Sequence, residues 1–228
     1  MKFYFTVFIL LLFAFDLQSQ GFNSIHTPDG VNVFAVGDSG KIYRSSNSGN
    51  GWYIYSFTSN NLKSVYTIGS DVWFAGDSGK VYKSNLNLNP ISVINVGQNF
   101  TIQSIFFVST STGYLCGGGG KIYKTFNGGL NWSSISSAID TLMLNSISFK
   151  DDMNGIVIGN NGKIYITTNG GVNWTLEKIS TNRNLLKAKY FVNGISVVGE
   201  YGTLLLKSVI FSWAQVNTRI SSDIRSVS

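Results

Sequence analysis

The sequence repeats itself, and this repeat constrains the fold more than any other feature. Residues 117–132 read GGGGKIYKTFNGGLNW, and residues 159–174 read GNNGKIYITTNGGVNW. The second glycine of a glycine-framed turn recurs at separations of 39, 41, 42 and 40 residues, at Gly40, Gly79, Gly120, Gly162 and Gly202. A second marker (NSI, KSV, QSI, NSI, KAK, RSV) keeps the same period, starting at Asn23, Lys63, Gln103, Asn145, Lys187 and Arg225. We therefore expect five copies of one unit and one strand of a sixth.

Each unit is predicted to hold four short strands. A short alternating segment precedes an apolar run that ends in Gly, and the five runs are VFAVG, VWFAG, GYLCG, GIVIG and ISVVG. Two residues and another Gly follow, then a strand such as KIYRS, a polar turn and a last strand that often begins at Trp. Two residues between glycines indicate a tight hairpin, because positive φ costs Gly nothing. The pattern is typical of an antiparallel meander.

The apolar runs indicate how the units pack. A strand with one solvated face alternates, whereas VFAVG and GIVIG do not, so both faces should be covered. One meander of this length is too small to be stable alone, but units packed face to face bury both faces. We therefore predict an all-β, four-stranded-blade β-propeller. Its repeats are expected at residues 22–61, 62–101, 102–143, 144–184 and 185–223, with a partial unit at 224–228.

The first 20 residues differ from the rest of the chain. Lys2 precedes an apolar run from Phe3 to Phe15, and Leu17-Gln18-Ser19 fits a cleavage site. A run this short suits a secretory signal better than a spanning helix, which needs about 20 residues; an uncleaved anchor is the alternative. We predict a signal peptide at 1–20, a propeller domain at 21–228 without a membrane span, and a secreted, periplasmic or cell-surface location.

Composition argues against several function classes. Cys116 is the only cysteine and His26 the only histidine, so we expect no disulfide, no metal site of the usual zinc type and no cofactor. The apolar run around Cys116 favours a buried thiol over a nucleophile. The segment GGGGK at Gly117–Lys121 lacks the spacing of a phosphate-binding loop.

The chain is basic, with a net charge of +6 and a pI near 9.3. This charge favours an anionic partner or serves solubility, and export makes nucleic acid a poor candidate. Four lysines follow the glycine turns at equivalent positions and would form a cationic arc near one rim: Lys41, Lys80, Lys121 and Lys163. The alternative is that duplication merely copied a solvated lysine. Four tyrosines of the third strands are expected to pack between blades: Tyr43, Tyr82, Tyr123 and Tyr165.

The polar turn of three units fits the pattern [S/T]-x-N-x-G-x-x-W. Asn can accept backbone N–H groups within the turn, Gly supplies a left-handed residue, and Trp buries a large area. The residues concerned are Asn47, Gly49 and Trp52; Asn127, Gly129 and Trp132; and Asn169, Gly171 and Trp174. The second unit has lost the pattern (SNLNLNPI, residues 84–91), and the fifth keeps only Trp213.

This turn resembles the Asp-box, or bacterial neuraminidase repeat, with Asn in the Asp position. Together with G-x-x-G-K-I-Y before it, it resembles the propellers related to photosystem II assembly and stability factors, over about Phe22–Ser228. The resemblance implies that the box is a structural hairpin, usually away from the ligand site. It also implies rings of commonly seven blades, so we expect the front part of a longer protein. A five-bladed ring with an accessory strand is the alternative.

Sialidases and related glycosidases also use box-bearing propellers, so an enzyme is the sharpest alternative. Such enzymes need paired carboxylates, or a Tyr nucleophile with carboxylate-binding arginines. The chain after residue 20 has only two glutamates, Glu177 and Glu200, and lacks the arginine-bearing N-terminal motif of sialidases. Asp38, Asp77 and Asp151-Asp152 are readily explained as turn residues.

We therefore expect an exported, non-catalytic propeller that acts as a protein- or glycan-binding or assembly scaffold. The alternatives are a sialidase-like carbohydrate-active enzyme and an adhesion or surface-display module of a longer exported protein.

Overall fold

The computed structural model describes residues 21–135, 139–140, 142–208 and 212–227. The predicted signal peptide at residues 1–20 lies outside them. The described residues form five antiparallel sheets of four strands each, which we call blades 1 to 5. The predicted propeller of four-stranded antiparallel blades is confirmed.

The strands follow one another in chain order within every blade. Blade 1 holds β1 (Phe22–His26), β2 (Val33–Gly37), β3 (Lys41–Ser45) and β4 (Tyr53–Ser56). Blade 2 holds β5 (Leu62–Ile68), β6 (Asp71–Gly76), β7 (Lys80–Asn85) and β8 (Ser92–Asn95). Blade 3 holds β9 (Ile102–Phe107), β10 (Gly113–Gly117), β11 (Lys121–Thr125) and β12 (Ser133–Ser134). Blade 4 holds β13 (Leu144–Phe149), β14 (Gly155–Gly159), β15 (Ile164–Thr167) and β16 (Thr175–Leu176). Blade 5 holds β17 (Leu185–Phe191), β18 (Gly194–Gly199), β19 (Leu204–Ser208) and β20 (Ala214–Gln215).

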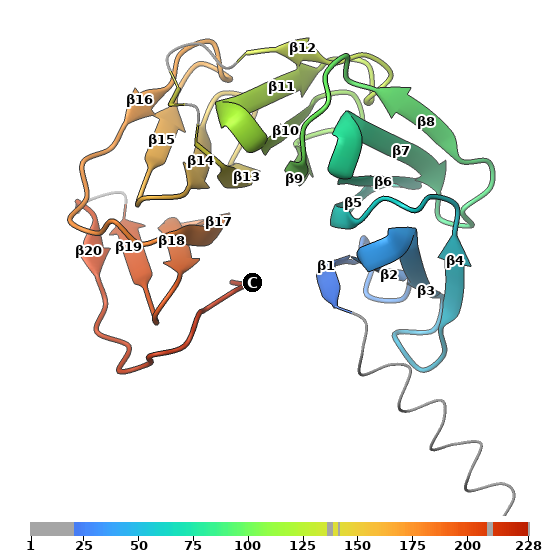
Figure 1. Cartoon of the computed structure of the whole chain (residues 1–228), viewed down its shortest axis with the longest axis horizontal. Helices are drawn as coiled ribbons and strands as arrows, with labels where there is room; N and C mark the ends of the chain where they lie inside the picture. Colours follow the sequence, from blue (N-terminus) through green and yellow to red (C-terminus); the bar gives the residue numbers. More distant parts are fainter. Residues whose placement is uncertain (1–20, 136–138, 141, 209–211, 228) are drawn as a thin grey trace, which may run out of the picture.

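The blades stand radially around one centre and form an open arc (Figure 1). The first strand of each blade lies nearest the centre, and the fourth lies at the outside. A gap separates blade 1 from blade 5, so the sheets do not close into a ring. We call the face of a blade that is turned toward the next blade in sequence its forward face, and the opposite face its backward face.

The hydrophobic cores lie between blades. Each of the four clusters of buried residues joins the forward face of one blade to the backward face of the next. In β6, Val72 and Phe74 pack toward blade 1, whereas Trp73 and Ala75 pack toward blade 3. An apolar run without alternation is therefore what this position requires, because both faces of the strand are buried.

A row of serines joins the first strands of neighbouring blades. In each case a serine hydroxyl accepts a hydrogen bond from a backbone N–H of the next blade's first strand, at 3.1–3.3 Å. The pairs are Ser24 with Val65, Ser64 with Ile105, Ser104 with Ile147, and Ser146 with Ala188. We call this row the serine ladder. The ladder satisfies polar groups inside the interfaces. Because each bond joins one particular serine to one particular N–H group, it also helps to fix the position of each first strand relative to the next.

The glycine-framed turn is one residue longer than we predicted. In blade 3, Gly117 pairs with Lys121, so three residues form the loop, and they adopt a short 3₁₀ turn, η3 (Gly118–Gly120). The turns η1 (Asp38–Gly40) and η2 (Asp77–Gly79) are equivalent. The last glycine is needed for two reasons: Gly79 has φ of 63°, and a Cβ there would lie 1.9 Å from the carbonyl oxygen of Gln98.

Residues 224–227 lie where the first strand of a sixth blade would begin. The N–H of Gly202 donates to Ser222 O. In blade 2 the equivalent N–H, that of Gly79, donates to Phe100 O, and Phe100 lies two residues before the first strand of blade 3. The N–H of Ile224 donates to Gly199 O at 3.0 Å. This segment has no assigned strand, since no second strand of its own blade pairs with it in the described residues.

The fifth copy of the strand-start marker is shifted by one residue from our alignment. Lys187 pairs with Val198, just as Ser146 pairs with Ile158 in blade 4. Lys187 therefore occupies the serine position, and not the position of Asn145. The sequence comparison missed this because the fifth copy lacks the serine that anchors the marker.

We expect that replacing Leu115 with Ala lowers the free energy of unfolding by about 2–5 kcal/mol. Leu115 is fully buried between blades 2 and 3, and truncation removes contacts and leaves a cavity. Val192→Ala is the control, because Val192 is 87% exposed and should change stability by less than about 0.5 kcal/mol. Urea unfolding measures both; equal effects of the two substitutions would contradict a core between the blades.

Candidate functional site

The Asn turns are held by a network within the turn. In blade 3, Thr125 Oγ1 accepts from the N–H groups of Asn127 and Gly129, and its hydroxyl donates to Asn127 Oδ1 at 3.0 Å. Asn127 Oδ1 also accepts the N–H of Asn131 at 3.0 Å. The same bonds recur around Asn47 and Asn169. The Asn side chain therefore acts through its oxygen, which is the atom type that an Asp would supply.

These turns also contact the preceding blade. The indole Nε1 of Trp73 donates to Gly128 O at 3.2 Å, and Lys124 Nζ donates to Gly170 O at 2.9 Å. In the altered turn of blade 2, Arg44 Nε donates to Leu86 O. The turn thus ties its own blade to the blade before it. All three turn glycines have positive φ: Gly49, Gly129 and Gly171.

The tryptophan of each Asn turn packs according to whether a preceding blade covers it. Trp174 is 7% exposed and belongs to the buried cluster between blades 3 and 4, where its ring meets Phe149 of its own blade edge to face at 6.1 Å. Trp132 packs against the cluster between blades 2 and 3 and meets Phe107 of its own blade in the same way at 5.9 Å. Trp52 is 42% exposed, because no blade precedes blade 1 in the described residues. All these contacts are packing contacts between side chains, and none of them activates a side chain for chemistry.

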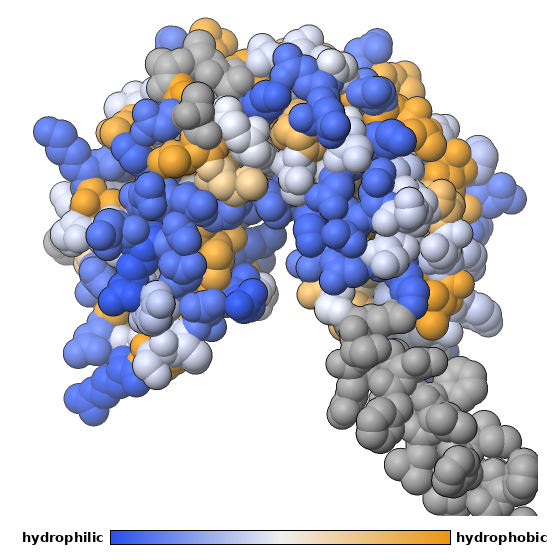
Figure 2. Space-filling model, in the orientation of Figure 1, coloured by the Kyte–Doolittle hydropathy of each residue, from blue (hydrophilic) through white to orange (hydrophobic). Residues whose placement is uncertain are grey.

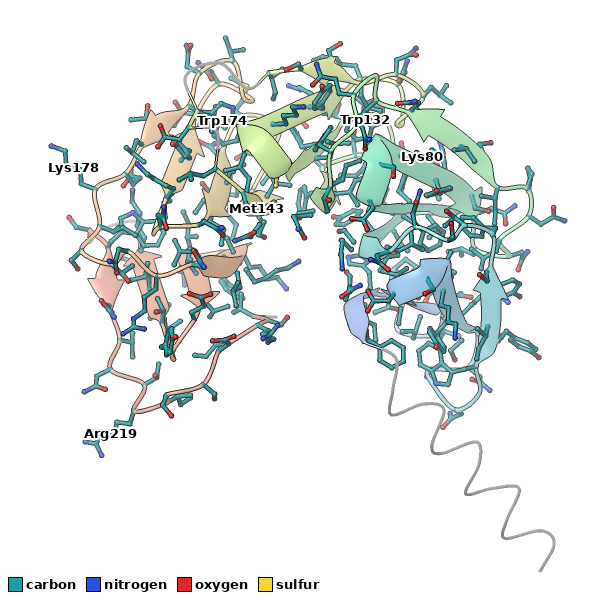
Figure 3. The ribbon with its side chains drawn as sticks, in the orientation of Figure 1. Lys80, Trp132, Met143, Trp174, Lys178 and Arg219 are labelled. Carbon is teal, nitrogen blue, oxygen red and sulfur yellow. The ribbon has the colours of Figure 1, made fainter. Side chains whose placement is uncertain are left out.

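The four repeated lysines begin equivalent third strands or directly precede one, and the turns η1, η2 and η3 face the same side of the arc (Figure 1). Lys163 is paired with Asp140 at 2.8 Å, and Lys121 Nζ lies 5.0 Å from the ring centre of Phe100. Lys41 and Lys80 form no ion pair in the part of the chain that the structure describes; Lys80 is labelled in Figure 3. The rim therefore keeps lysines without an ion pair, although Asp38 of η1, Asp77 of η2 and Asp140 bring negative charge to the same rim.

The first strands bring polar and aromatic groups to the centre of the arc. The ring of His26 lies 4.5 Å from that of Tyr66, which lies 5.0 Å from that of Phe106. His26 Nδ1 accepts the N–H of Thr67 at 3.3 Å and contacts the Thr67 hydroxyl at 2.6 Å. Burial, and then the positive charges of Lys187 and Lys189, lowers the pKa of His26 to about 4. The sequence analysis identified His26 only as the single histidine of the chain. Its position in the repeat, equivalent to those of Tyr66 and Phe106, is the sequence signal that could have predicted this stack.

The carboxylates expected of an enzyme are engaged in internal contacts. Glu177 Oε2 accepts from Lys207 Nζ at 2.8 Å and from the indole Nε1 of Trp213 at 2.9 Å. Glu200 accepts the N–H and the side-chain amide of Asn184. Both glutamates are therefore held by contacts within the protein, as is typical of structural carboxylates.

Cys116 is fully buried, and burial raises the pKa of its thiol. This disfavours the thiolate that a nucleophile requires. Over the described ranges, the structure contains no grouping of three or more potential metal ligands. A search of the same residues for a helix of sufficient length and apolarity to cross a membrane finds none.

The repeats match the model of one protein family. The family model described as photosynthesis system II assembly factor YCF48 matches residues 83–197, which is half of the chain. No curated protein sequence matches the chain significantly.

Several solved structures share the fold. A YCF48 bound to a D1 peptide is 13% identical, with a TM-score of 0.72, and the match covers 90% of this chain and 69% of that one. YCF48 from Cyanidioschyzon merolae is 18% identical, with a TM-score of 0.68 and coverages of 89% and 74%. An ancestral GH74 enzyme is 16% identical, with a TM-score of 0.71, but this chain spans only 33% of its length while 86% of this chain is covered. At these identities the likeness concerns the fold.

Replacing Asn127 with Ala should lower the free energy of unfolding by about 1 kcal/mol, because the N–H of Asn131 loses its acceptor. Asn127→Asp retains an acceptor oxygen and should cost less than about half as much. Asn131→Ala is the matched control, since only the backbone of Asn131 takes part. Chemical unfolding of the three variants tests this, and equal losses for Ala and Asp at position 127 would contradict it.

The stability of the protein should fall between pH 6.5 and about 4 because of His26. Its pKa is lowered in the folded state, so in this window the unfolded chain binds a proton that the folded one does not, and stability is lost as the pH falls. The loss is roughly 1.4 kcal/mol per pH unit at most. His26→Asn keeps an acceptor for Thr67 but does not titrate, so unfolding curves at several pH values should show a smaller loss. Identical pH dependence in both proteins would count against this.

Proposed function

The chain belongs to the family of the photosynthesis system II assembly factor YCF48, and we propose that it is a non-catalytic scaffold that binds a segment of a partner protein. The observation that carries the proposal is the likeness of the whole arc to a YCF48 that holds a D1 peptide. We carry over the kind of ligand, a peptide segment, and not D1 itself, because fold alone does not determine the partner.

The architecture supports a binding role. Four buried interfaces hold the blades as one rigid arc, and the turns of several blades face the same side. Such an arrangement presents loops from several repeats to one ligand. Lys41, Lys80 and Lys121, on the rim, would raise the local concentration of an anionic protein or glycan, an effect that salt weakens.

We also propose that the protein is exported, to the periplasm, the cell surface or the medium. The basis is the sequence of residues 1–20, in which a lysine, a short apolar run and a small-residue site follow one another.

A carbohydrate-active enzyme is the second candidate, because an ancestral GH74 enzyme shares the fold. The internal contacts of Glu177 and Glu200 favour the scaffold, since neither carboxylate is free to act as an acid or a nucleophile.

The purified protein should bind a subset of peptides on an array of unrelated 15-residue peptides and should release no reducing sugar from xyloglucan. Replacement of the four rim lysines by Gln should weaken binding to the acidic peptides at low salt and leave neutral ones unaffected. A blank array would contradict the binding role, and release of sugar would establish the enzyme instead. Unchanged binding of acidic peptides by the quadruple variant would remove the rim from the proposal.

A further inference from the structure

A cavity of about 390 Å³ lies between blades 4 and 5, beside their outer strands. It is bounded by the forward face of blade 4 and the backward face of blade 5, and so does not lie at the gap between blades 1 and 5. Its walls combine apolar and polar side chains: Lys178, Ile179, Ser180, Leu205, Trp213 and Gln215. A cavity of roughly 150 Å³ is enough to hold benzene, so this one has room for an aromatic ring.

The cavity lies where the three preceding interfaces hold a tyrosine. Tyr82, Tyr123 and Tyr165 each belong to the buried cluster that joins their own blade to the blade before it. In blade 5 this position is Leu205, which pairs with Val197 just as Tyr165 pairs with Val157 in blade 4. A leucine is shorter than a tyrosine and has no hydroxyl, so the space that the ring would occupy stays open.

The opposite wall has also lost a ring relative to the first interface. Between blades 1 and 2, the ring of Phe57 lies 5.1 Å from that of Tyr82. Phe57 directly precedes the residue whose carbonyl oxygen lies against the last glycine of the glycine-framed turn, and Ser180 directly precedes the equivalent residue of blade 4. Ser180 therefore occupies the place of Phe57. The pair of Leu205 and Ser180 fills much less volume than the pair of Tyr82 and Phe57.

The hydrogen-bond partner of the tyrosine is nevertheless retained. The hydroxyl of Tyr82 donates to Thr58 Oγ1 at 3.0 Å, and Thr181 is the equivalent of Thr58 in blade 4. Each threonine hydroxyl also accepts the backbone N–H two residues farther along, at 3.2 Å, so the two side chains have the same orientation. Since blade 5 presents Leu205, no phenol from that strand bonds Thr181. A hydroxyl that enters the cavity from outside finds the same partner.

Trp213 gives the cavity an aromatic wall that is held in place. Its indole Nε1 donates to Glu177 Oε2 at 2.9 Å, and its ring packs against the buried cluster between blades 4 and 5. Aromatic rings attract one another in offset and edge-to-face arrangements, so this wall favours a ring as ligand. Hydrophilic side chains surround the central space of the arc in Figure 2, whereas this cavity near the outside has apolar walls. Lys178, at the cavity, projects outward from the arc (Figure 3) and can donate to a peptide carbonyl group.

We propose that this cavity binds a tyrosine side chain of a partner protein. The ring lies between Leu205 and Ser180, beside Trp213, and its hydroxyl bonds Thr181. The chain itself fills the three equivalent spaces with tyrosine, and this is why tyrosine is the ligand that fits. The site deepens the proposed peptide-binding function and rests on it.

The test uses the full chain and three pentapeptides with blocked ends, Ser-Gly-X-Gly-Ser, in which X is Tyr, Phe or Ala. Saturation-transfer NMR at equal peptide concentrations should show binding of the Tyr peptide, weaker binding of the Phe peptide and no binding of the Ala peptide. Thr181→Val should remove the preference for Tyr over Phe, because valine offers no hydrogen-bond partner to the phenol.

Two substitutions fill the cavity from opposite walls. Leu205→Tyr and Ser180→Phe each introduce the residue that another blade carries at the same position, and each should weaken binding of the Tyr peptide about tenfold or more, because the ring loses its space. Thermal unfolding of both variants should occur at or above the temperature of the unaltered protein, since each restores a contact that another interface contains.

Leu206→Tyr is the matched control. It makes the same substitution one residue later, where the side chain faces the other side of β19 and is 40% exposed, so the affinity for the Tyr peptide should change by less than about twofold. Equal effects of Leu206→Tyr and Leu205→Tyr, or equal binding of the Tyr and Ala peptides, would overturn the site.

Two further outcomes separate this site from other ligands and from the scaffold itself. Displacement of the Tyr peptide by an equal concentration of methyl β-glucoside would assign the aromatic wall to a sugar and overturn the tyrosine ligand. If the peptide array binds but Leu205→Tyr changes nothing, the scaffold stands and this site fails. A blank array with binding of the Tyr pentapeptide would leave a cavity for an isolated tyrosine and overturn the partner protein.

Discussion

The burial of apolar side chains between neighbouring sheets is the interaction on which the rest of this structure depends. Every cluster of buried residues joins two blades. A strand such as β10, in which all five residues are buried, exists because a sheet lies on each side of it. A single blade would expose both of these faces to water, at a cost of roughly 25 cal/mol for each Å² of apolar surface. The blades are therefore stable as an array, as is general for repeat proteins.

Polar contacts then determine how the blades are oriented. The serine ladder acts at the inner strands, and the Asn turns act farther out, where Trp73 and Lys124 donate to carbonyl groups of the next blade. These bonds satisfy donors and acceptors that the interfaces would otherwise bury unpaired. Their repetition gives each blade the same relation to its neighbour, so equivalent turns of successive blades face the same side of the arc.

The scaffold function that we propose depends on what the faces and rims of the arc offer to a ligand. The most distinctive residues of the Asn turns serve the fold, and the two glutamates are tied to Lys207, Trp213 and Asn184. The departures from the repeat are more informative than the repeat itself. Lys187 pairs with Val198 as Ser146 pairs with Ile158, so blade 5 carries a lysine where the other four blades carry the ladder serine.

The sequence alone determined the period, the four strands of each blade and the packing of blades on both faces, because these follow from local patterns of glycine and apolar residues. It also identified the Asn turns, whose bonds span only four residues. The tertiary structure decided what depends on pairing between distant segments: the three-residue length of the glycine turn, the approach of Gln98 O to Gly79, and the stack of His26 on Tyr66. The position of Lys187 in the serine ladder belongs to the same group. Strand register decides which face a side chain occupies, and a shift of one residue in a degenerate repeat is invisible until the strands are paired.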